Sequence, residues 1–483
     1  MKNILDSLIG FVSPKVAFRR EQYRNALGVI RKYEGASKGR RTDSWEARGT
    51  SANAEISLAI STLRDRSRDF GRNNPYARNA NRVITNNTVG KGIRLTYPKL
   101  ASQNLKDYWW KWAETKAIDF EGRVTLYGLQ RLVMRTVAES GEAIVLRRRY
   151  SKGILPIQIQ VVEGDYLDHT RNEEQLYGGG YIMQGVEFDS EGRRVAYYLW
   201  DRHPSDAFNN KVRRVPAEDV LHVYEALRPG QVRGVPFGTS AMIRLRDFDE
   251  YEDAELIRKK IAACFSVFVT DPNGDPSSSS DIDRLEKVEP GIVEYLEPGK
   301  EVTFAAPPAA EGYEEYSRKI LQAISGGYGI TYEALTNDYS NVNFSSGRMG
   351  WIEMHRNVEG WQTEMLVPQF CDPVWAWFLE AYFLKTGEKV DFPAEWTPPR
   401  REMIDPVKET EGVVKAIRGG IKPWQEAVRE QGYDPDVVIE QLKEDKEAFD
   451  EAGLQLECDI RFDKGKQVSG NGDNNNNDEE SKN

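Results

Sequence analysis

The sequence contains few of the residues that most often carry catalysis or bind metals. Its 483 residues include only three cysteines and four histidines. Cys264, Cys371 and Cys458 are odd in number and lie far apart along the chain, which disfavours both a disulfide framework and a zinc site. Free thiols in a reducing compartment fit this pattern better. The cysteines therefore favour a cytoplasmic protein.

Two groups of acidic and histidine residues invite a metal-site interpretation, and both are weak. His169 follows Asp165 and Asp168 in an expected strand-end loop, but no further ligand supports a site there. Six acids crowd residues 247–255, and charges spread so widely over a helix are more simply a solvated or intersubunit face. The remaining histidines have no better context: His203, His222 and His355. We predict no bound metal and no cofactor.

Nucleotide-binding and catalytic motifs are also missing from the sequence. Gly90-Lys91-Gly92 and Gly299-Lys300-Glu301 lack both the spacing and the hydroxyl of a P-loop. Because no catalytic constellation is found, we predict that the chain is not an enzyme. The alternative is a hydrolase with an acid and histidine site scattered through the α+β region described below.

Long hydrophobic runs are absent as well. The longest, Ile261–Val269, covers nine residues, whereas a bilayer-spanning helix needs about 20. Met1–Val12 has an apolar helical face, but Asp6 interrupts it and no small-residue cleavage site follows, so it is not a convincing signal peptide. We predict no membrane association.

The net charge of −10 disfavours a protein that coats nucleic acid. Tight coating needs clustered Lys and Arg to replace the counterions of the phosphates. A surface past which nucleic acid merely slides is compatible with this charge. Residues 1–50 are the exception, with eleven Lys and Arg against five acids, and we expect them to form a solvated basic arm. The alternative is an arm that contacts a partner or nucleic acid.

The first half of the chain has the pattern of an α+β domain. Apolar spacing predicts helices from Ser51 to Phe70 and over 105–112 and 126–140, and Asn74-Pro75 is a good start signal for a helix that ends at Val89. From Glu142 the period changes to two. This change predicts strands at 143–146, 157–161, 181–188 and 195–200, the last two joined by a turn at 189–192. The domain is expected to end near Glu225.

The stretch from Gly234 to Gly350 has an unusual order of elements. A charged helix of about 27 residues, roughly 40 Å long, is expected from Thr239 to about Phe265, with Thr239 or Ser240 as its cap. An insert follows with two short strands, Gly291–Leu296 and Val302–Ala305, and then a second helix from near Gly312 to Gly326. A helix so long and so charged is better explained by packing against copies of itself than by burial in one core.

A polar loop, Asn337–Ser346, follows the second helix. Its amide and hydroxyl side chains can contact phosphates through hydrogen bonds without holding them tightly. Long loops between helices are often functional. The candidate residues for such contacts are Asn337, Ser340, Asn341, Asn343, Ser345 and Ser346, followed by Arg348.

The C-terminal third is expected to be largely helical. Residues 348–382 are rich in aromatics, and Pro368 and Pro373 should kink or break that helix. Residues 392–402 are a Pro-rich linker. A further helical segment runs from Asp405 to Ala452 with breaks at Gly419-Gly420 and Gly432, and the tail beyond residue 455 is acidic, Asn-rich and expected to be disordered.

Several segments occur in a defined order along the chain. They are Arg72–Ala80, Val89–Arg94, Ser140–Arg147, Val215–His222, Arg228–Pro236, Tyr251–Leu256 and Lys260–Ala263. In this order they resemble the lambda-type family of phage portal proteins, over roughly residues 1–460. The resemblance implies a ring, usually a dodecamer, at one vertex of the phage head.

The resemblance also implies a division of the protomer, with an α/β wing, a two-helix stem, a small β clip and a helical crown. The segments would be a basic arm (1–50), wing (51–238), first stem helix (239–269), clip (270–309), second stem helix (310–330), tunnel loop (331–347), an aromatic-rich helical return to the wing (348–402), crown (403–455) and acidic tail (456–483). The seven candidate residues from Asn337 to Arg348 would then face a DNA channel.

The function implied is genome packaging, ejection and head–tail attachment. The implied partners are further copies of the chain, double-stranded DNA, the terminase large subunit that hydrolyses ATP, a major capsid or scaffold protein, and a head–tail adaptor. The protein would lie at the portal vertex of the virion after assembly in the host cytoplasm. A different head–tail connector component is another alternative, although such proteins are usually much shorter.

Overall fold

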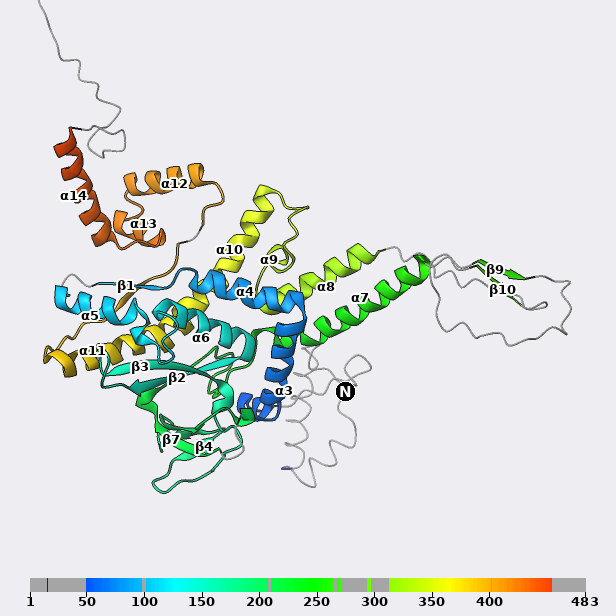
Figure 1. Ribbon diagram of the computed structural model, residues 1–483, viewed down its shortest axis with the longest axis horizontal. Coiled ribbons are helices and arrows are strands. Elements are labelled where there is room, and N and C mark those ends of the chain that lie inside the picture. Colours follow the sequence, from blue (N-terminus) through cyan, green and yellow to red (C-terminus); the bar gives the residue numbers. More distant parts are fainter. Residues whose placement is uncertain are drawn as a thin grey trace, which may run out of the picture. The chain divides into compact units, whose positions relative to one another are not determined.

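The computed structural model describes residue 15 and residues 49–97, 101–206, 210–263, 267–270, 293–296, 312–400 and 402–453. The chain divides into two compact units, Met1–Glu55 and Ile56–Asn483. Nearly all described elements belong to the second unit. They combine helices with small, mostly antiparallel sheets (Figure 1), which confirms the predicted α+β class. Most of the predicted basic arm and the predicted acidic tail lie outside the described residues.

The first helices begin and end where the sequence indicates. Helix α3 covers Ala52–Asn73 and α4 covers Pro75–Val89. Asn74 separates them, and its side-chain oxygen accepts a hydrogen bond from the backbone N–H of Ala77. This is the expected N-cap with proline at the first helical position.

A three-stranded antiparallel sheet lies at the centre of the α+β region. Strand β2 (Glu142–Arg149) pairs with β3 (Ile157–Glu163) on one side and β8 (Val220–Tyr224) on the other. Alternate residues of β2 enter two different cores: Ala143 and Val145 pack with the helices, whereas Ile144 and Leu146 pack with a second sheet. The first half of β2 is therefore buried on both faces, as its apolar run Ala143–Leu146 requires.

Helices cover one face of this sheet. They are α5 (Gln103–Ala113), α6 (Leu126–Ser140) and α11 (Asp372–Thr386). Trp109 of α5 meets Phe378 of α11 edge to face, with ring centroids 4.9 Å apart. Trp109, Trp112 and Phe378 are therefore core residues, whereas Trp110 of α5 is exposed. Short 3-10 turns connect the elements at Lys116–Ile118, Gly164–Tyr166, Pro204–Asp206 and Ala217–Asp219.

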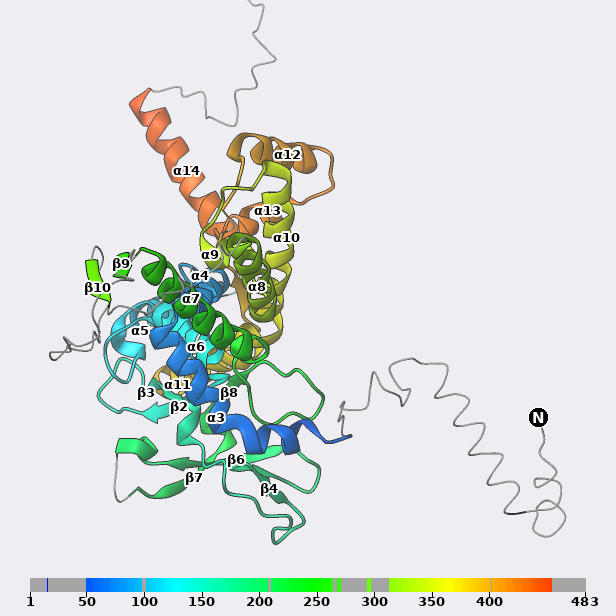
Figure 2. The same ribbon diagram turned by 90° about the vertical axis from the view of Figure 1, so that its right-hand side faces the viewer.

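A four-stranded antiparallel sheet covers the other face, as Figure 2 shows. Its strands are β4 (Tyr181–Met183), β5 (Val186–Phe188), β6 (Arg194–Trp200) and β7 (Val212–Pro216). The prediction of one strand over 181–188 was wrong, because this segment folds back on itself. Gln184 (φ 51°) and Gly185 (φ 82°) both adopt the left-handed backbone of a two-residue hairpin turn.

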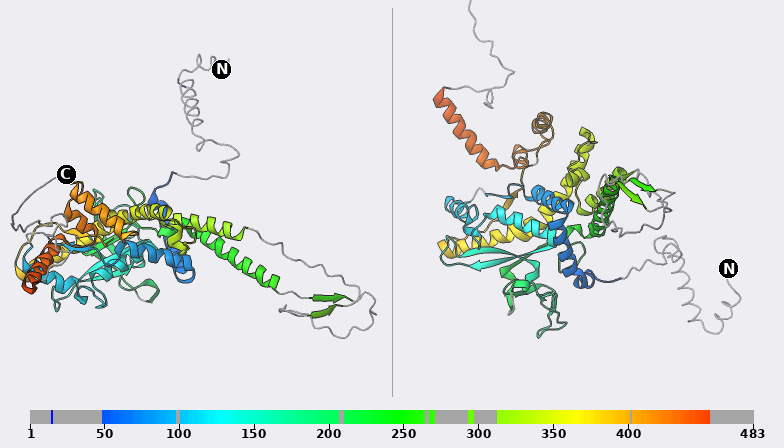
Figure 3. Two further views of the ribbon diagram at one scale, coloured as in Figure 1. Left: turned by 90° about the horizontal axis from the view of Figure 1, so that it is seen from above. Right: turned by 45° about the vertical axis from the view of Figure 1, so that its right-hand side comes forward.

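Two long helices follow the sheets and lie side by side (Figure 3). Helix α7 covers Met242–Ala263 and α8 covers Tyr313–Tyr328. The predicted start at Thr239 was wrong, because a 3-10 turn (Phe237–Ala241) precedes α7 and the Thr239 hydroxyl donates to the Pro236 carbonyl instead of capping the helix. Helix α7 therefore has 22 residues, fewer than the 27 expected.

Two short strands are described between these helices. Strand β9 (Val267–Thr270) pairs in parallel with β10 (Val293–Leu296). Strand β10 lies within one of the predicted strands, Gly291–Leu296. Strand β9 was not predicted, and its residues fall in a stretch expected to continue the first long helix. The other predicted strand, Val302–Ala305, lies outside the described residues.

The aromatic-rich segment forms one continuous helical path. Helix α10 (Phe344–Gly360) runs into a π-helix, η7 (Trp361–Cys371), and then into α11. Of the predicted kink or break at Pro368, a break does not occur, because the proline lies inside the π-helix, where the Asp372 N–H bonds to the Val367 carbonyl five residues back. The wider turn accommodates the proline. Pro373 lies in the first turn of α11, where its missing N–H costs nothing.

The segment predicted to be a Pro-rich linker contains a strand. Strand β11 (Glu395–Thr397) pairs antiparallel with β1 (Arg94–Thr96), and the hydroxyls of Thr96 and Thr397 lie 2.6 Å apart. Three helices then follow with breaks at the expected glycines: α12 (Pro406–Arg418), α13 (Trp424–Glu430) and α14 (Pro435–Ala452). No helix in the described part of the chain is long and apolar enough to cross a bilayer.

Candidate functional site

The candidate segment from Asn337 to Arg348 begins at the end of a short helix, α9 (Tyr332–Thr336). Asn337 ends that helix in the left-handed conformation (φ 57°), which asparagine tolerates better than most residues. The predicted ten-residue loop is shorter in the structure, because α10 begins at Phe344. Ser345 and Ser346 therefore lie in the first turn of a helix and not in a loop.

Asn343 is the N-cap of α10. Its side-chain oxygen accepts a hydrogen bond from the Ser346 N–H at 2.8 Å, and the Ser346 hydroxyl accepts one from the Asn343 N–H at 3.2 Å. This reciprocal pair is a capping box. Asn343 and Ser346 therefore have a structural role that the sequence analysis missed, although Asn followed three residues later by Ser could have signalled it.

The loop between the two helices is held by its single acid. Asp338 accepts hydrogen bonds from the backbone N–H and the hydroxyl of Ser340, and from the Tyr332 hydroxyl. The bonds from Ser340 hold the pKa of Asp338 below its ordinary value. The side chain of Ser340 is therefore occupied within the loop.

The remaining candidates have exposed side chains. Asn341 lies in the loop, Ser345 in the first turn of α10, and Arg348 one turn further on. Within the part of the chain that the structure describes, none of these three side chains forms a hydrogen bond to another residue. The side chain of Asn337 is exposed and likewise forms no hydrogen bond to another described residue. Asn337, Asn341, Ser345 and Arg348 are thus the candidates still available for a ligand or partner.

The acids of α7 do not gather into a metal site. Asp249 accepts a hydrogen bond from the Asn74 amide at 2.7 Å, Glu252 accepts one from the Tyr313 hydroxyl at 3.3 Å, and Glu255 pairs with Arg258 at 2.6 Å. The other three are exposed: Asp247, Glu250 and Asp253. The acids of α7 therefore divide into packing contacts and a solvent-facing set.

One group of potential metal ligands does come together elsewhere. Glu163, Asp165 and His203 have ligand atoms within 4.8 Å of one another. However, Arg64 lies 3.1 Å and Arg68 2.6 Å from Asp165, so its carboxylate charge is already balanced. We interpret this group as an ion-pair network. His169, which the sequence placed near Asp165, is not part of it, and burial lowers its pKa.

The most elaborate polar arrangement in the described chain surrounds a fully buried acid, Glu142, at the start of β2. Arg64 of α3 lies 2.7 Å from Glu142 Oε1, and the Arg233 Nε donates to Oε2 at 2.9 Å. His222 Nε2 of β8 lies 3.0 Å from Oε2, and the Gly234 N–H donates to the same oxygen at 3.1 Å. We call Arg64, Glu142, His222 and Arg233 the Glu142 network.

The charges of this network are set by its partners. Burial alone would raise the pKa of the Glu142 carboxyl, but the Arg233 guanidinium and the His222 hydrogen bond hold it well below its ordinary value. Burial lowers the pKa of His222 to about 4, against the opposing effect of Glu142. At neutral pH a carboxylate therefore lies between two guanidinium groups and a neutral imidazole that donates from Nε2.

Backbone packing completes the network. Gly141 (φ 91°) approaches Val235 so closely that a Cβ atom at position 141 would lie 2.5 Å from the Val235 carbonyl carbon. A Cβ at Gly234 would lie 2.1 Å from the Gly141 oxygen. Glycine is therefore required where the chain leading into α7 crosses the start of β2. The network joins the base of α7 to the central sheet.

Sequence reasoning missed this network because its members are far apart in the chain. A signal was present, however, since Glu142, His222 and Arg233 each lie in one of the segments that carry the family resemblance: Ser140–Arg147, Val215–His222 and Arg228–Pro236. The network holds the fold and exposes no reacting group, since Glu142, His222 and Arg233 have completely buried side chains.

Comparison with known proteins agrees with the resemblance. Residues 38–362, about two thirds of the chain, match the model of the family described as phage portal protein, lambda family. A probable portal protein of Halomonas phage phiHAP-1 is 27% identical over 461 residues, which cover 88% of each chain. Portal protein B of Escherichia phage lambda is 21% identical, with 86% of this chain and 89% of the relative covered.

Solved structures similar to this chain come from gene transfer agent (GTA) particles. A chain of the neck of an empty GTA particle, computed with C6 symmetry, has a TM-score of 0.43 and 12% identity, covering 78% of this chain and 92% of that one. A chain of the neck of the native particle, computed with C12 symmetry, has a TM-score of 0.40 and 12% identity, covering 75% and 91%.

The family model spans the α+β region, both long helices and α10. The relatives cover the chain almost from end to end. The chain therefore belongs to the lambda family of phage portal proteins, which are structural, non-enzymatic components of the virion.

Proposed function

We propose that this protein assembles into a ring, a dodecamer, at one vertex of the phage head. The ring encloses a channel through which double-stranded DNA enters during packaging and leaves during ejection, and it provides the attachment point for the tail. Membership of the lambda portal family is the basis of this proposal.

The protomer divides accordingly into functional segments. The α+β region up to residue 238 is the wing, α7 and α8 are the stem, and the insert at 270–309 is the clip. Residues 331–347 are the tunnel loop, residues 348–402 return to the wing, and α12–α14 form the crown. Asn341 and Ser345 then contribute polar groups to the channel wall without closing it to DNA.

The observation that best supports a ring is the surface of the α7–α8 pair. The two helices meet along one seam, where Tyr251 packs on Tyr316 with ring centroids 4.7 Å apart and Phe248 is fully buried. Away from this seam α7 exposes three large apolar side chains: Ile243 (75% exposed), Leu256 (50%) and Ile257 (56%). A neighbouring copy of the stem would cover these side chains.

Charge on the same helix fits a contact between copies. Asp247, Glu250 and Asp253 are exposed along α7, and Arg246 and Lys260 are exposed on the same helix. Arg246 already pairs with Glu250 at 3.0 Å within the helix, so Asp247, Asp253 and Lys260 are the charges that can pair between neighbouring stems, with an apolar contact at each end. Surface pairs of this kind contribute little individually, so the apolar residues should dominate.

The oligomeric state tests this proposal directly. We expect native mass spectrometry and negative-stain imaging of the full chain to show closed rings. Replacing Ile243 and Ile257 together by Glu should shift the population toward smaller species, because it places charge in an apolar contact. Leu58→Glu is the matched control, since Leu58 is 88% exposed on α3 and outside the stem. A strictly monomeric wild type in varied salt would refute the ring.

The partners follow from the same assignment. The terminase large subunit supplies ATP hydrolysis, a major capsid or scaffold protein holds the ring in the head, and a head–tail adaptor binds its outer end. Assembly takes place in the host cytoplasm, and the finished ring remains at the portal vertex of the virion.

A further inference from the structure

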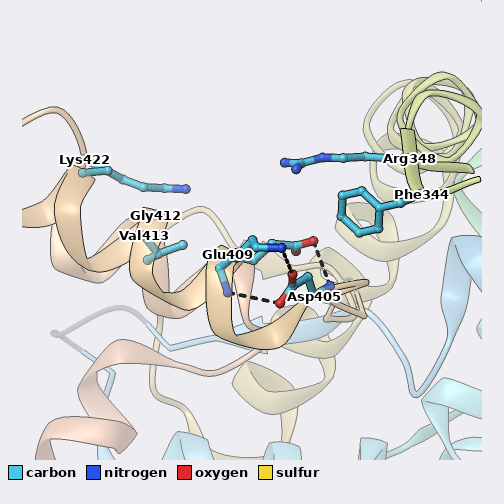
Figure 4. Close-up of a pocket in the computed structure, with 9 residues that line it drawn as sticks. Phe344, Arg348, Asp405, Glu409, Gly412, Val413 and Lys422 are labelled. Atoms are coloured by element: carbon cyan, nitrogen blue, oxygen red, sulfur yellow. Dashed lines mark hydrogen bonds and ion pairs between the residues drawn. The ribbon is translucent and has the colours of Figure 1, made fainter. Parts of the chain in front are cut away.

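A pocket of about 340 Å³ lies between the start of α10 and helix α12. Figure 4 shows it lined by side chains from both helices and from the turn that follows α12. The apolar lining consists of Phe344, Gly412, Val413 and Ala416, and the charged lining consists of Arg348, Asp405, Lys408, Glu409 and Lys422. Arg348, the last of the candidate channel residues, therefore lies beside α12, although the two are far apart in the sequence.

The two acids of the pocket are occupied by backbone groups. Asp405 caps α12 by accepting a hydrogen bond from the Lys408 N–H at 3.2 Å. Glu409 accepts bonds from the N–H groups of Ile404 and Asp405 at 3.3 and 3.4 Å. Lys408 also uses its ammonium group, which lies 2.9 Å from Asp405 Oδ2. Asp405, Lys408 and Glu409 therefore bond mainly to one another and to the backbone at the N-terminus of α12.

The other two cations have a different arrangement. Arg348 and Lys422 extend toward one another across the pocket, as Figure 4 shows. Among the described residues no carboxylate pairs with Arg348. Lys422 pairs with Glu430, but an ammonium group has three donors. Two like charges that face one another across a cavity repel, and a bound anion would add to the charge balance that Asp405, Glu409 and Glu430 already provide.

We propose that this pocket binds a phosphate group of the DNA backbone. The inference rests on the proposed function, since it requires DNA to pass the start of α10. The Arg348 guanidinium supplies a planar fork that matches two phosphate oxygens, and Lys422 supplies a point charge from the opposite side. The ring of Phe344 and the side chain of Val413 lie beneath and present an apolar surface to the deoxyribose.

One such pocket per protomer is compatible with an acidic protein through which DNA moves. Because the chain carries a net charge of −10, the pocket is an isolated contact and not part of a basic wall. Each phosphate contact adds a small, salt-dependent increment of affinity. A ring of separate pockets would therefore hold DNA at rest without preventing its passage.

Binding of a labelled DNA duplex to the full-length assembled protein tests the inference. The variant carries Arg348→Gln and Lys422→Gln. The control carries Arg356→Gln in α10 and Lys415→Gln in α12, which remove the same amount of charge at positions 67% and 78% exposed and already paired with Glu353 and Glu411. We expect the pocket variant to bind roughly tenfold more weakly and to lower the slope of log K against log salt by about 1. The control should change affinity less than about threefold.

Competition identifies the chemical group that the pocket recognises. At matched ionic strength, inorganic phosphate should displace the duplex from wild-type protein more effectively than chloride does, and this difference should vanish in the pocket variant. Equal loss of affinity in variant and control, or a phosphate effect that persists in the variant, would overturn the assignment.

Negative-stain imaging of the same samples separates the two proposals. If rings form normally and the two double variants bind DNA equally well, the phosphate-binding pocket is contradicted, but the proposed ring is not. Protein that forms no rings contradicts the proposed function and with it this inference.

Discussion

The Glu142 network and the segment from Asn337 to Arg348 are both rich in polar groups, yet they are built in opposite ways. Glu142 and its partners are buried, and every carboxylate oxygen has at least two donors. In the exposed segment, Asp338 bonds to Ser340, and Asn343 bonds to Ser346. The segment also exposes the side chains of Asn341, Ser345 and Arg348 to solvent. The first region is closed to a ligand by burial, although Arg64 Nε and His222 Nδ1 have no hydrogen-bond partner among the described residues, whereas the second keeps exposed polar groups.

The difference shows what polar residues do in each setting. A buried charge is tolerated only with complete pairing, so the network fixes the position of the α7 base relative to the sheet. An exposed loop needs only enough internal hydrogen bonds to define its backbone. The structure therefore separates residues that hold the protomer together from residues whose side chains remain available for a ligand or partner.

Removing the central carboxylate should have the largest effect on stability. Glu142→Gln removes the carboxylate that lies between Arg64 and Arg233 in the interior and leaves Arg64 with Asp165, which should cost about 3–5 kcal/mol. Thermal or urea unfolding would measure this loss. Glu250→Gln is the matched control, because Glu250 pairs with Arg246 on the surface and should change stability by less than about 1 kcal/mol. If the two variants lost similar amounts of stability, the Glu142 network would contribute no more to stability than a surface ion pair.

Acidification should weaken the network before it affects the loop. The pKa of His222 is about 4 in the folded chain, below its ordinary value of 6.5, so below pH 6.5 the unfolded chain takes up a proton that the folded chain does not. The contribution of His222 is therefore complete above pH 6.5 and is lost as pH falls toward 4, with a limiting slope of about 1.4 kcal/mol per pH unit.

The lowered pKa of Glu142 acts in the same direction below pH 4.5. Measuring the free energy of unfolding from pH 7 to pH 4 in wild type and in His222→Gln gives the contribution of His222 to the pH dependence, because His169 is present in both proteins. An unaltered pH profile in the variant would exclude this role for His222.

Substitutions in the exposed segment should have the smallest effect on stability. They should also distinguish Asn343, which caps a helix, from Asn341, whose side chain forms no hydrogen bond to another described residue. Asn343→Ala removes the cap of α10 and should cost about 1 kcal/mol, whereas Asn343→Ser keeps a capping oxygen. Asn341→Ala should change stability by less than about 0.5 kcal/mol. If Asn341 faces the channel, Asn341→Lys should impair DNA packaging while rings still form. Loss of rings in that variant would instead indicate a structural role.

Local chemistry was sufficient to predict most elements of the fold. The Asn74-Pro75 start of α4, the glycine breaks before α13 and α14, and the change from period 3.6 to period 2 at Glu142 each depend on neighbouring residues. The errors have a different origin. The Gln184-Gly185 turn, the π-helix around Pro368 and strand β11 depend on partners that lie elsewhere in the chain or on a backbone geometry that apolar periodicity does not reveal.

The sequence by itself determined the class of fold, the succession of elements and, through the order of its segments, the family. Only the tertiary structure decided which polar residues are structural and which are available. His222 had no distinguishing neighbours in sequence, yet it lies 3.0 Å from a carboxylate 80 positions away. Asn343 and Asn341 are alike in sequence, but only Asn343 lies where a helix begins. Burial and hydrogen-bond pairing are properties of the folded chain, and they assign these roles.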